Sequence, residues 1–218
     1  MSIKERLHRI LSTIPEGVKL VAVSKFHPAE RLQEAYDAGQ RIFGESRPQE
    51  MTAKYELLPK DIEWHMIGHL QTNKVRSIAP FVALVQSVDS ERLLRLIDRE
   101  AARCGRVIDV LLEVHVAEEQ TKSGWAVEEL TAFVRSGALA TLPNVRVRGI
   151  MGMATNTDNE AIIRHDFEQL FSIKKLLSSH FDSTFDTLSM GMSDDYELAI
   201  SCGSNMVRVG SLIFGCRG

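Results

Sequence analysis

The feature that most constrains the fold is the regular alternation of short apolar runs with longer segments of helical spacing. The runs are rich in Val, Ile and Leu and do not alternate strictly with polar residues. They occupy positions 19–25, 41–45, 64–70, 81–88, 109–116, 145–153, 186–192 and 206–215. Such runs are typical of parallel strands that are covered on both faces. Eight of them, alternating with helices, predict a closed (β/α)8 barrel of the TIM type.

Helix signals lie between the expected strands. The segment 28–39 has a proline in its first turn and a glycine after its end. A later segment opens with Thr157 and Glu160, which predict a capping box. Residues 1–14 have the apolar spacing of an amphipathic helix, so we expect an extra N-terminal helix before the first strand.

The length of the chain fits one domain. Its 218 residues lie at the short end of the range for this barrel, roughly 200 to over 400, so we expect a single domain, 1–218. A doubly wound open sheet is the competing architecture. It fits less well, because no glycine-rich dinucleotide-binding turn follows the first apolar run.

Composition and charge argue against several classes of protein. Hydrophobic residues make up 44% and charged residues 25%, which is ordinary for a folded domain. A net charge of -3 disfavours nucleic-acid binding, and no apolar run approaches the ~20 residues of a membrane helix. Cys104, Cys202 and Cys216 form neither a CxxC pair nor a zinc-type cluster. We expect a cytoplasmic protein that binds no metal, nucleic acid or membrane, and we take it to be a monomer.

The first apolar run carries a lysine, Lys25, at its C-terminal end. On its own, such a lysine is best interpreted as turning into solvent, because charged side chains are rarely buried without a partner. In a (β/α)8 barrel, however, functional groups occupy the C-terminal ends of the strands. A lysine in the barrel mouth is partly desolvated, which lowers its pKa and frees the amine to attack a carbonyl. Both interpretations of Lys25 stay open at this point.

The last two expected strands end in residues suited to an anion. Ser193 follows Met192 where a helix is expected to begin, and Arg208 lies on the last run, with Gly210 and Ser211 at its end. Backbone N–H groups, a serine hydroxyl and a helix N-terminus together form an anion site, and a phosphate usually binds here in this fold. A plain helix N-cap is the alternative for Ser193, and the two aspartates that follow it weigh against a phosphate.

Several longer segments resemble one known family. They are "VAVSK", "FGE" with "PQE", "WHMIGHLQTNK", "KSG", "RGIMGMA", "LSMGMSDDYELAI" and "GSNMVRVGSLIFG". Along essentially its whole length the chain resembles the YggS/PROSC family of pyridoxal phosphate homeostasis proteins. The resemblance implies a barrel similar to the N-terminal domain of alanine racemase (fold-type III), which binds pyridoxal 5′-phosphate (PLP) as a Schiff base.

The resemblance also implies a role for each candidate residue. Lys25 would be the Schiff-base lysine. The phosphate would be held by Ser193, Gly210 and Ser211, with the backbone of Met192 beside them. We expect no residue with a catalytic role.

Arg208 would lie near the pyridine nitrogen of the cofactor. A guanidinium stays protonated, so it would keep this nitrogen unprotonated and the ring a weak electron sink. The function implied is to hold PLP and take part in its intracellular homeostasis, or in its delivery to PLP-dependent apoenzymes, without strong catalysis.

The chain departs from the family pattern at two places. Ser46 and Arg47 stand where the family usually has Asn and Tyr, so a contact from an asparagine to the ring oxygen of PLP is not expected. Phe26 and His27 follow Lys25 where many members carry a second basic residue. His65 matches the family and is a candidate for the pyridine ring, although a hydrogen-bonded core histidine is the better interpretation.

Two other functions are compatible with the same residues. The first is a PLP-dependent amino-acid racemase of fold-type III, which needs a second acid/base group; we find no sequence that would form another domain to supply it. The second is a phosphosugar enzyme in which Lys25 forms a Schiff base with the substrate. Only a PLP-binding protein would be yellow when purified.

Overall fold

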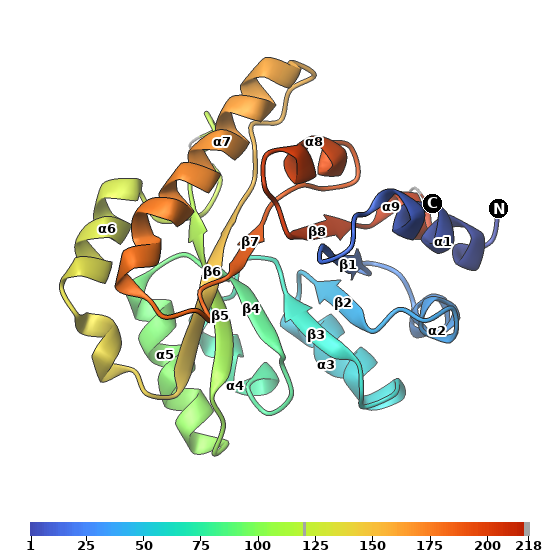
Figure 1. The fold of residues 1–218 in the computed structure, drawn as a ribbon. Helices are drawn as coiled ribbons and strands as arrows, with labels where there is room; N and C mark the ends of the chain where they lie inside the picture. Colours follow the sequence, from blue (N-terminus) through green and yellow to red (C-terminus); the bar gives the residue numbers. More distant parts are fainter. Residues whose placement is uncertain (120, 216–218) are drawn as a thin grey trace.

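The chain forms a closed barrel of eight parallel strands, as drawn in Figure 1. This computed structural model describes residues 1–119 and 121–215. The strands are β1 (Lys19–Val23), β2 (Ile42–Glu45), β3 (Glu63–Met66), β4 (Leu84–Val88), β5 (Ile108–Val114), β6 (Val145–Gly152), β7 (Thr187–Ser189) and β8 (Met206–Val209). Each strand pairs with the next, and β8 pairs with β1. The predicted barrel is therefore confirmed, and the open sheet is excluded.

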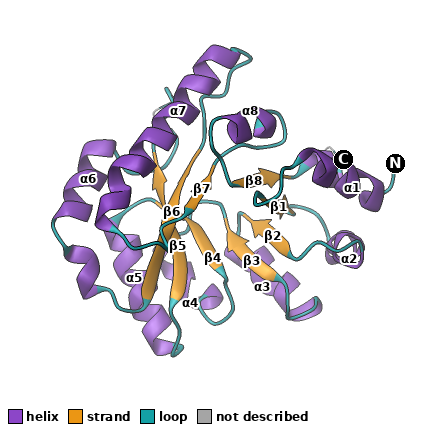
Figure 2. Ribbon diagram, in the orientation of Figure 1, coloured by secondary structure: helices purple, strands orange, loops and turns teal. Residues whose placement is uncertain are grey.

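Helices surround the barrel, as Figure 2 shows. The α-helices are α1 (Ile3–Thr13), α2 (Ala29–Asp37), α3 (Pro48–Leu57), α4 (Val75–Ile78), α5 (Glu91–Arg103), α6 (Val127–Arg135), α7 (Glu160–Leu177), α8 (Tyr196–Ser201) and α9 (Ser211–Phe214). Short 3-10 helices are η1 (Thr72–Lys74), η2 (Ala138–Thr141) and η3 (Ser178–His180). The expected N-terminal helix is α1, which packs beside α9. Within the described part of the chain, no helix is both long and apolar enough to span a bilayer.

Two local predictions were wrong. The last apolar run is not strand throughout, because β8 ends at Val209 and the run continues as α9. The start of α7 is capped by Asn159, whose side chain accepts from the amide of Ala161 at 3.0 Å. Thr157 instead accepts from the amide of Asn159 at 3.2 Å, so it belongs to the turn before the cap.

Alternate residues of the strands face the barrel interior, as the two-residue period of a strand requires. Nearer the N-terminal ends of the strands, the interior is filled by an apolar cluster of Val21, Leu84, Leu111, Met151 and Met206. Two positions further along their strands, the same face carries the buried polar side chains of Gln86, Glu113 and Arg208. The interior thus changes from apolar to polar toward the C-terminal end of the barrel.

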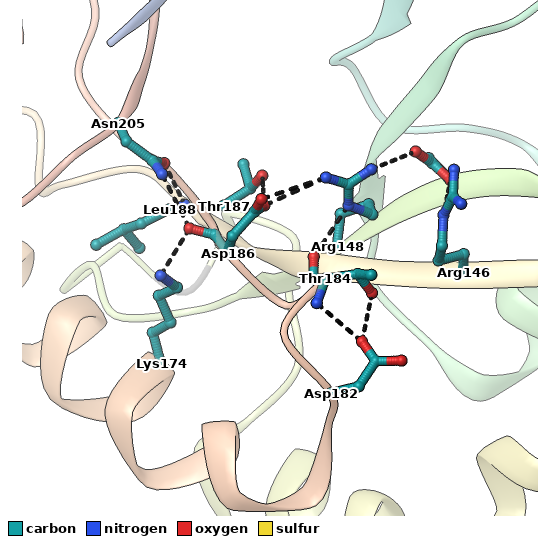
Figure 3. A network of polar contacts seen from close by, with 10 residues as sticks. Arg146, Arg148, Lys174, Asp182, Thr184, Asp186, Thr187, Leu188 and Asn205 are labelled. Carbon is teal, nitrogen blue, oxygen red and sulfur yellow. Dashed lines mark hydrogen bonds and ion pairs between the residues drawn. The ribbon is translucent and has the colours of Figure 1, made fainter. Parts of the chain in front are cut away.

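An ion-pair network joins the opposite end of the barrel, where β5, β6 and β7 begin (Figure 3). Arg148 contacts Asp109 at 3.1 Å and Asp186 at 3.3 Å, and its Nε donates to the carbonyl of Thr184. Arg146 contacts the other oxygen of Asp109 at 2.7 Å. These contacts tie three strand starts together far from the strand ends that carry the predicted site.

Candidate functional site

The six residues predicted to bind a cofactor line one cavity at the mouth of the barrel. Lys25 follows β1, Met192 and Ser193 follow β7, and the rest are Arg208 of β8 with Gly210 and Ser211 after it. We call this space of about 270 Å³ the mouth cavity; its other lining residues are Val23, His27, Ser46, Ile67, Met153, Asp194 and Gly215. Parallel strands end on the same side of a barrel, which is why residues so far apart in sequence meet here.

Other hollows on the described surface are larger than the mouth cavity. One of about 1130 Å³ adjoins the mouth cavity and shares Met153, Met192, Ser193 and Asp194 with it. Another of about 870 Å³ lies between α4 and α5 in the outer ring and is rich in arginine. No lysine lines the second hollow, and Lys122, which lines the first, is paired with Glu119 at 3.0 Å.

A buried ion pair supports the backbone just before Lys25. Lys54 of α3 donates to a carboxylate oxygen of Glu45 at 2.6 Å and to the carbonyl of Ser24 at 2.9 Å. The hydroxyl of Ser24 donates to the same Glu45 oxygen at 2.6 Å. Burial raises the pKa of Glu45, and the neighbouring Lys54 opposes that rise. This cluster joins β1, β2 and α3 directly beneath Lys25.

The backbone after Lys25 is held by the same helix. Phe26 has a φ of 68°, a left-handed conformation that is uncommon outside glycine. Its amide donates to Glu50 of α3 at 3.0 Å, and Glu50 lies 3.6 Å from the ammonium group of Lys54. Glu45 of β2 and Glu50 of α3 therefore hydrogen-bond to the residues on both sides of Lys25. Sequence reasoning did not find this cluster, although the segments "FGE" and "PQE" contain both carboxylates.

The turn after β8 packs closely against the end of β1. A Cβ at Gly210 would lie 3.0 Å from the carbonyl oxygen of Val23, so a side chain there would crowd β1. The amide of Gly210 donates to the hydroxyl of Ser193 at 3.2 Å, which joins the two loops. Serine hydroxyls and an amide at one small opening fit a phosphate group. Asp194 also lines the cavity, as the aspartates noted in the sequence implied.

Two details of the loop after β7 differ from the prediction. Helix α8 begins at Tyr196, so Ser193 lies in the turn before it and does not cap it. The amide of Met192 donates to the carboxylate of Asp195 at 2.6 Å, so this amide already has an acceptor. Met192 contributes a half-exposed side chain to the rim of the mouth cavity.

Arg208 is buried and firmly held. One guanidinium nitrogen donates to the hydroxyl of Ser189 at 2.6 Å, and another donates to the carbonyl of Gly152 at 3.0 Å. Burial lowers the pKa of Arg208 to about 10, and the acids Glu113 and Asp195 oppose that shift. The guanidinium therefore stays charged at neutral pH.

Glu113 is a buried acid that sequence reasoning missed. Its side chain is 3% exposed, and its Oε2 has no hydrogen-bond partner among the described residues. Burial, with a smaller effect from Asp89, raises the pKa of Glu113 to about 7, while Arg208 opposes the rise. Nothing in its local sequence distinguishes it, because "DVLLEV" reads as an ordinary strand.

The residues at the family departures lie at the mouth as well. Ser46 and His27 line the mouth cavity, and the ring of His27 lies 5.0 Å from that of Phe214. Arg47 points elsewhere, over the ring of Phe26 and toward Glu50. His65 is buried and does not line the cavity; its Nδ1 lies 2.9 Å from the amide nitrogen of Gln86. The interpretation of His65 as a hydrogen-bonded core residue is confirmed.

Comparison with known proteins adds independent information. The family model for the N-terminal domain of alanine racemase matches residues 1–218. A pyridoxal phosphate homeostasis protein of Aquifex aeolicus is 38% identical, and the alignment covers 100% of this chain and 99% of that protein. One of Vibrio alginolyticus is 36% identical over 99% of this chain and 98% of that protein.

Solved structures agree with the sequence comparison. PipY of Synechococcus elongatus with PLP bound is 38% identical, with a TM-score of 0.90 over 98% of this chain and 100% of that one. Alanine racemase of Clostridium difficile has a TM-score of 0.75 at 16% identity, over 99% of this chain and 57% of that one. This second likeness concerns the fold alone. The chain belongs to the family of pyridoxal phosphate homeostasis proteins, whose barrel is that of the alanine racemase N-terminal domain.

Proposed function

We propose that this protein binds PLP in the mouth cavity, with Lys25 as the covalent attachment point, and takes part in PLP homeostasis. The observation that carries the proposal is the single cavity that brings together Lys25, Arg208 and the loop of Ser193, Gly210 and Ser211. The PLP-bound structure of PipY, 38% identical over nearly the whole chain, supports the same ligand.

The chemistry of the lining residues fits the parts of the cofactor. The aldehyde of PLP condenses with a primary amine and releases water, and Lys25 supplies the amine. The hydroxyls of Ser193 and Ser211 supply donors for the phosphate, and the amide of Gly210 orients Ser193 by donating to its hydroxyl oxygen. Arg208, held by Ser189 and Gly152, supplies a permanent positive donor for the ring nitrogen.

The same arrangement favours a carrier over an enzyme. A donor that never gives up its proton leaves the ring nitrogen unprotonated, which weakens the ring as an electron sink. We further propose that the chain acts as one domain and a monomer in the cytoplasm, and that it passes PLP to dependent apoenzymes. The racemase alternative rests only on the fold shared with alanine racemase.

The test is reductive trapping. Purified protein is incubated with PLP, treated with borohydride and mapped by peptide mass spectrometry. We expect the label on Lys25, because it is the one lysine that lines the mouth cavity in the described chain. Lys25→Ala should lose the yellow colour, while Lys60→Ala, on the exposed surface, should keep it. Recovery of the label mainly on another lysine would contradict the assignment.

A further inference from the structure

A chain of hydrogen bonds runs from Arg208 across the barrel interior. Arg208 donates to Ser189 at 2.6 Å, and the hydroxyl of Ser189 donates to Oε1 of Gln86 at 2.6 Å. Nε2 of Gln86 lies 2.9 Å from Nδ1 of His65. All four side chains are at most 4% exposed. Ser189 is on β7 and Gln86 on β4, which are not neighbours in the barrel, so the middle bond crosses the interior.

The direction of every bond in this chain is fixed by its first member. A guanidinium can only donate, so Ser189 must accept from Arg208 and use its own hydrogen on Gln86. The carbonyl end of the Gln86 amide therefore faces Ser189, and its NH2 faces Nδ1 of His65. A flipped amide would give Ser189 two donors and leave its hydroxyl hydrogen without an acceptor in the chain.

His65 is suited to end such a chain. Burial is the main cause that lowers the pKa of His65 to about 3, and the charge of Lys19 adds to it. A neutral imidazole has one nitrogen that accepts and one that donates. With Nδ1 accepting from Gln86, the hydrogen of the ring must be on Nε2.

We propose that Gln86 and His65, through Ser189, are positioning residues that hold the Arg208 guanidinium for the ring nitrogen of PLP. The inference rests on the proposed function, since it concerns the residue assigned to that nitrogen. All three bonds of the chain run away from Arg208, so no member of it donates a hydrogen bond back toward the guanidinium. The chain therefore fixes the position of Arg208, which is a pure donor by its own chemistry.

The first test needs no cofactor. Long-range ¹H–¹⁵N NMR of the apoprotein at neutral pH separates protonated from unprotonated ring nitrogens, and His65→Phe identifies the signal. We expect a neutral His65 with hydrogen on Nε2 only. A His65 with hydrogen on Nδ1, or on both nitrogens, would overturn the proposal. The tautomer is read in the wild-type protein, and His65→Phe serves only to assign its signal.

The second test links the chain to the ligand. Gln86→Leu removes both the acceptor for Ser189 and the donor for His65, and its matched control is Gln40→Leu. Gln40 is also a buried glutamine, but its amide bonds the carbonyls of Leu20 and Ile42 away from the mouth cavity. We expect Gln86→Leu to bind PLP about tenfold more weakly and Gln40→Leu within about twofold of wild type.

The readouts also separate the positioning role from general destabilisation. The two terminal nitrogens of a held guanidinium give separate ¹⁵N signals, which merge when it rotates freely. We expect separate Arg208 signals in wild type and Gln40→Leu, and merged signals in Gln86→Leu. Unchanged signals and unchanged PLP affinity in a folded Gln86→Leu would overturn the inference. If wild-type protein does not bind PLP at Lys25, the proposed function fails, and the His65 tautomer still reports on the chain.

Discussion

At the scale of single residues, Glu113 and His65 are buried groups of the barrel whose pKa values are shifted far from their ordinary values. Glu113 holds a proton to about pH 7, and His65 stays neutral down to about pH 3. Both effects come mainly from burial, which disfavours the charged form of either group. They affect stability in opposite directions of pH: the His65 contribution is lost as pH falls from 6.5 toward about 3, and the Glu113 contribution is lost as pH rises from 4.5 toward about 7.

Glu113→Gln should stabilise the protein at pH 8 but not at pH 4.5. Between the ordinary carboxyl value of 4.5 and about 7, the unfolded chain loses a proton that folded Glu113 keeps, so wild-type stability falls. The full loss is roughly 3 kcal/mol, and the variant avoids it. Urea unfolding across this pH range measures the difference, with Glu56→Gln on the exposed surface as control. A difference that did not vary with pH would count against a buried acid at position 113.

Ser193→Ala and Ser211→Ala should each weaken PLP binding. A hydrogen bond to a charged group contributes roughly 1.5–3 kcal/mol, or about ten- to a hundredfold in affinity per serine. Pyridoxal, which lacks the phosphate, should bind poorly and respond to neither change. Absorbance titration measures the affinity of each variant for PLP and for pyridoxal. Ser201→Ala, at an exposed position of α8, is the control. Equal affinity for pyridoxal and PLP would remove the phosphate from the proposal.

At the scale of elements, the Glu45–Lys54 pair joins α3 to the end of β1. Lys54→Met should destabilise the fold by roughly 3 kcal/mol, because it leaves Glu45 buried without its partner. It should also slow reductive trapping at Lys25, because the carbonyl of Ser24 loses its donor and Glu50, which accepts from the amide of Phe26, loses its ion pair. Adding Glu45→Gln should restore part of the stability. Urea unfolding and trapping rates measure both effects, and Lys60→Met should change neither. Full stability of Lys54→Met would show that Glu45 does not depend on the pair.

The ion pairs at the other end of the barrel concern stability alone. Arg148→Met removes contacts to Asp109, Asp186 and Thr184 that join the starts of β5, β6 and β7 (Figure 3). We expect a loss of roughly 1–2 kcal/mol and PLP affinity within about twofold of wild type. Thermal unfolding and PLP titration test this, with exposed Arg135→Met expected to change neither. A large loss of PLP affinity would mean that the two ends are coupled.

The sequence predicts elements better than the contacts between them. Short apolar runs located all eight strands, since burial on both faces leaves a local pattern. The strand β8 was predicted too long, because Leu212, Ile213 and Phe214 are as apolar in α9 as in a strand. A free cysteine is usually buried, yet Cys104 is exposed, and Cys216 lies outside the described residues.

The sequence identifies candidate residues where a single side chain carries the chemistry. It misses residues whose role depends on a contact with a partner elsewhere in the chain. Lys25 and Arg208 became candidates because they lie at predicted strand ends and match the family resemblance. Gln86 and Ser189 were not identified, because their role depends on a hydrogen bond between positions 103 residues apart. The same holds for Glu45 with Lys54, which sit in a strand and a helix whose packing the sequence does not state.

At the scale of the whole molecule, the barrel should not racemise alanine at a useful rate. Racemisation needs an acid or base on each face of the substrate carbon. The hydroxyls of Tyr36 and Tyr196 bond Asp61 and Thr13 on the outer side of the barrel, and Tyr55 stacks on Phe81. His65 is engaged by Gln86 and lies outside the mouth cavity, so His27 is the histidine that lines it.

The assay is conversion of L-alanine to D-alanine by PLP-loaded protein. We expect no turnover above that of Lys25→Ala. His27→Ala serves as the second variant, because it removes the one imidazole at the described cavity wall. Robust turnover that both substitutions abolish would favour the enzyme over the carrier.

The closed sheet also limits how another protein can approach. Each strand from β1 to β8 has a bonded neighbour on both sides, so the sheet has no free edge. Recognition by strand addition requires an open row of backbone donors and acceptors, which a barrel does not offer. An apoenzyme that receives PLP directly must therefore recognise this protein through side chains, on the loops around the strand ends. Its specificity would lie in the residues of that rim, the part of a barrel that can change without disturbing the strands.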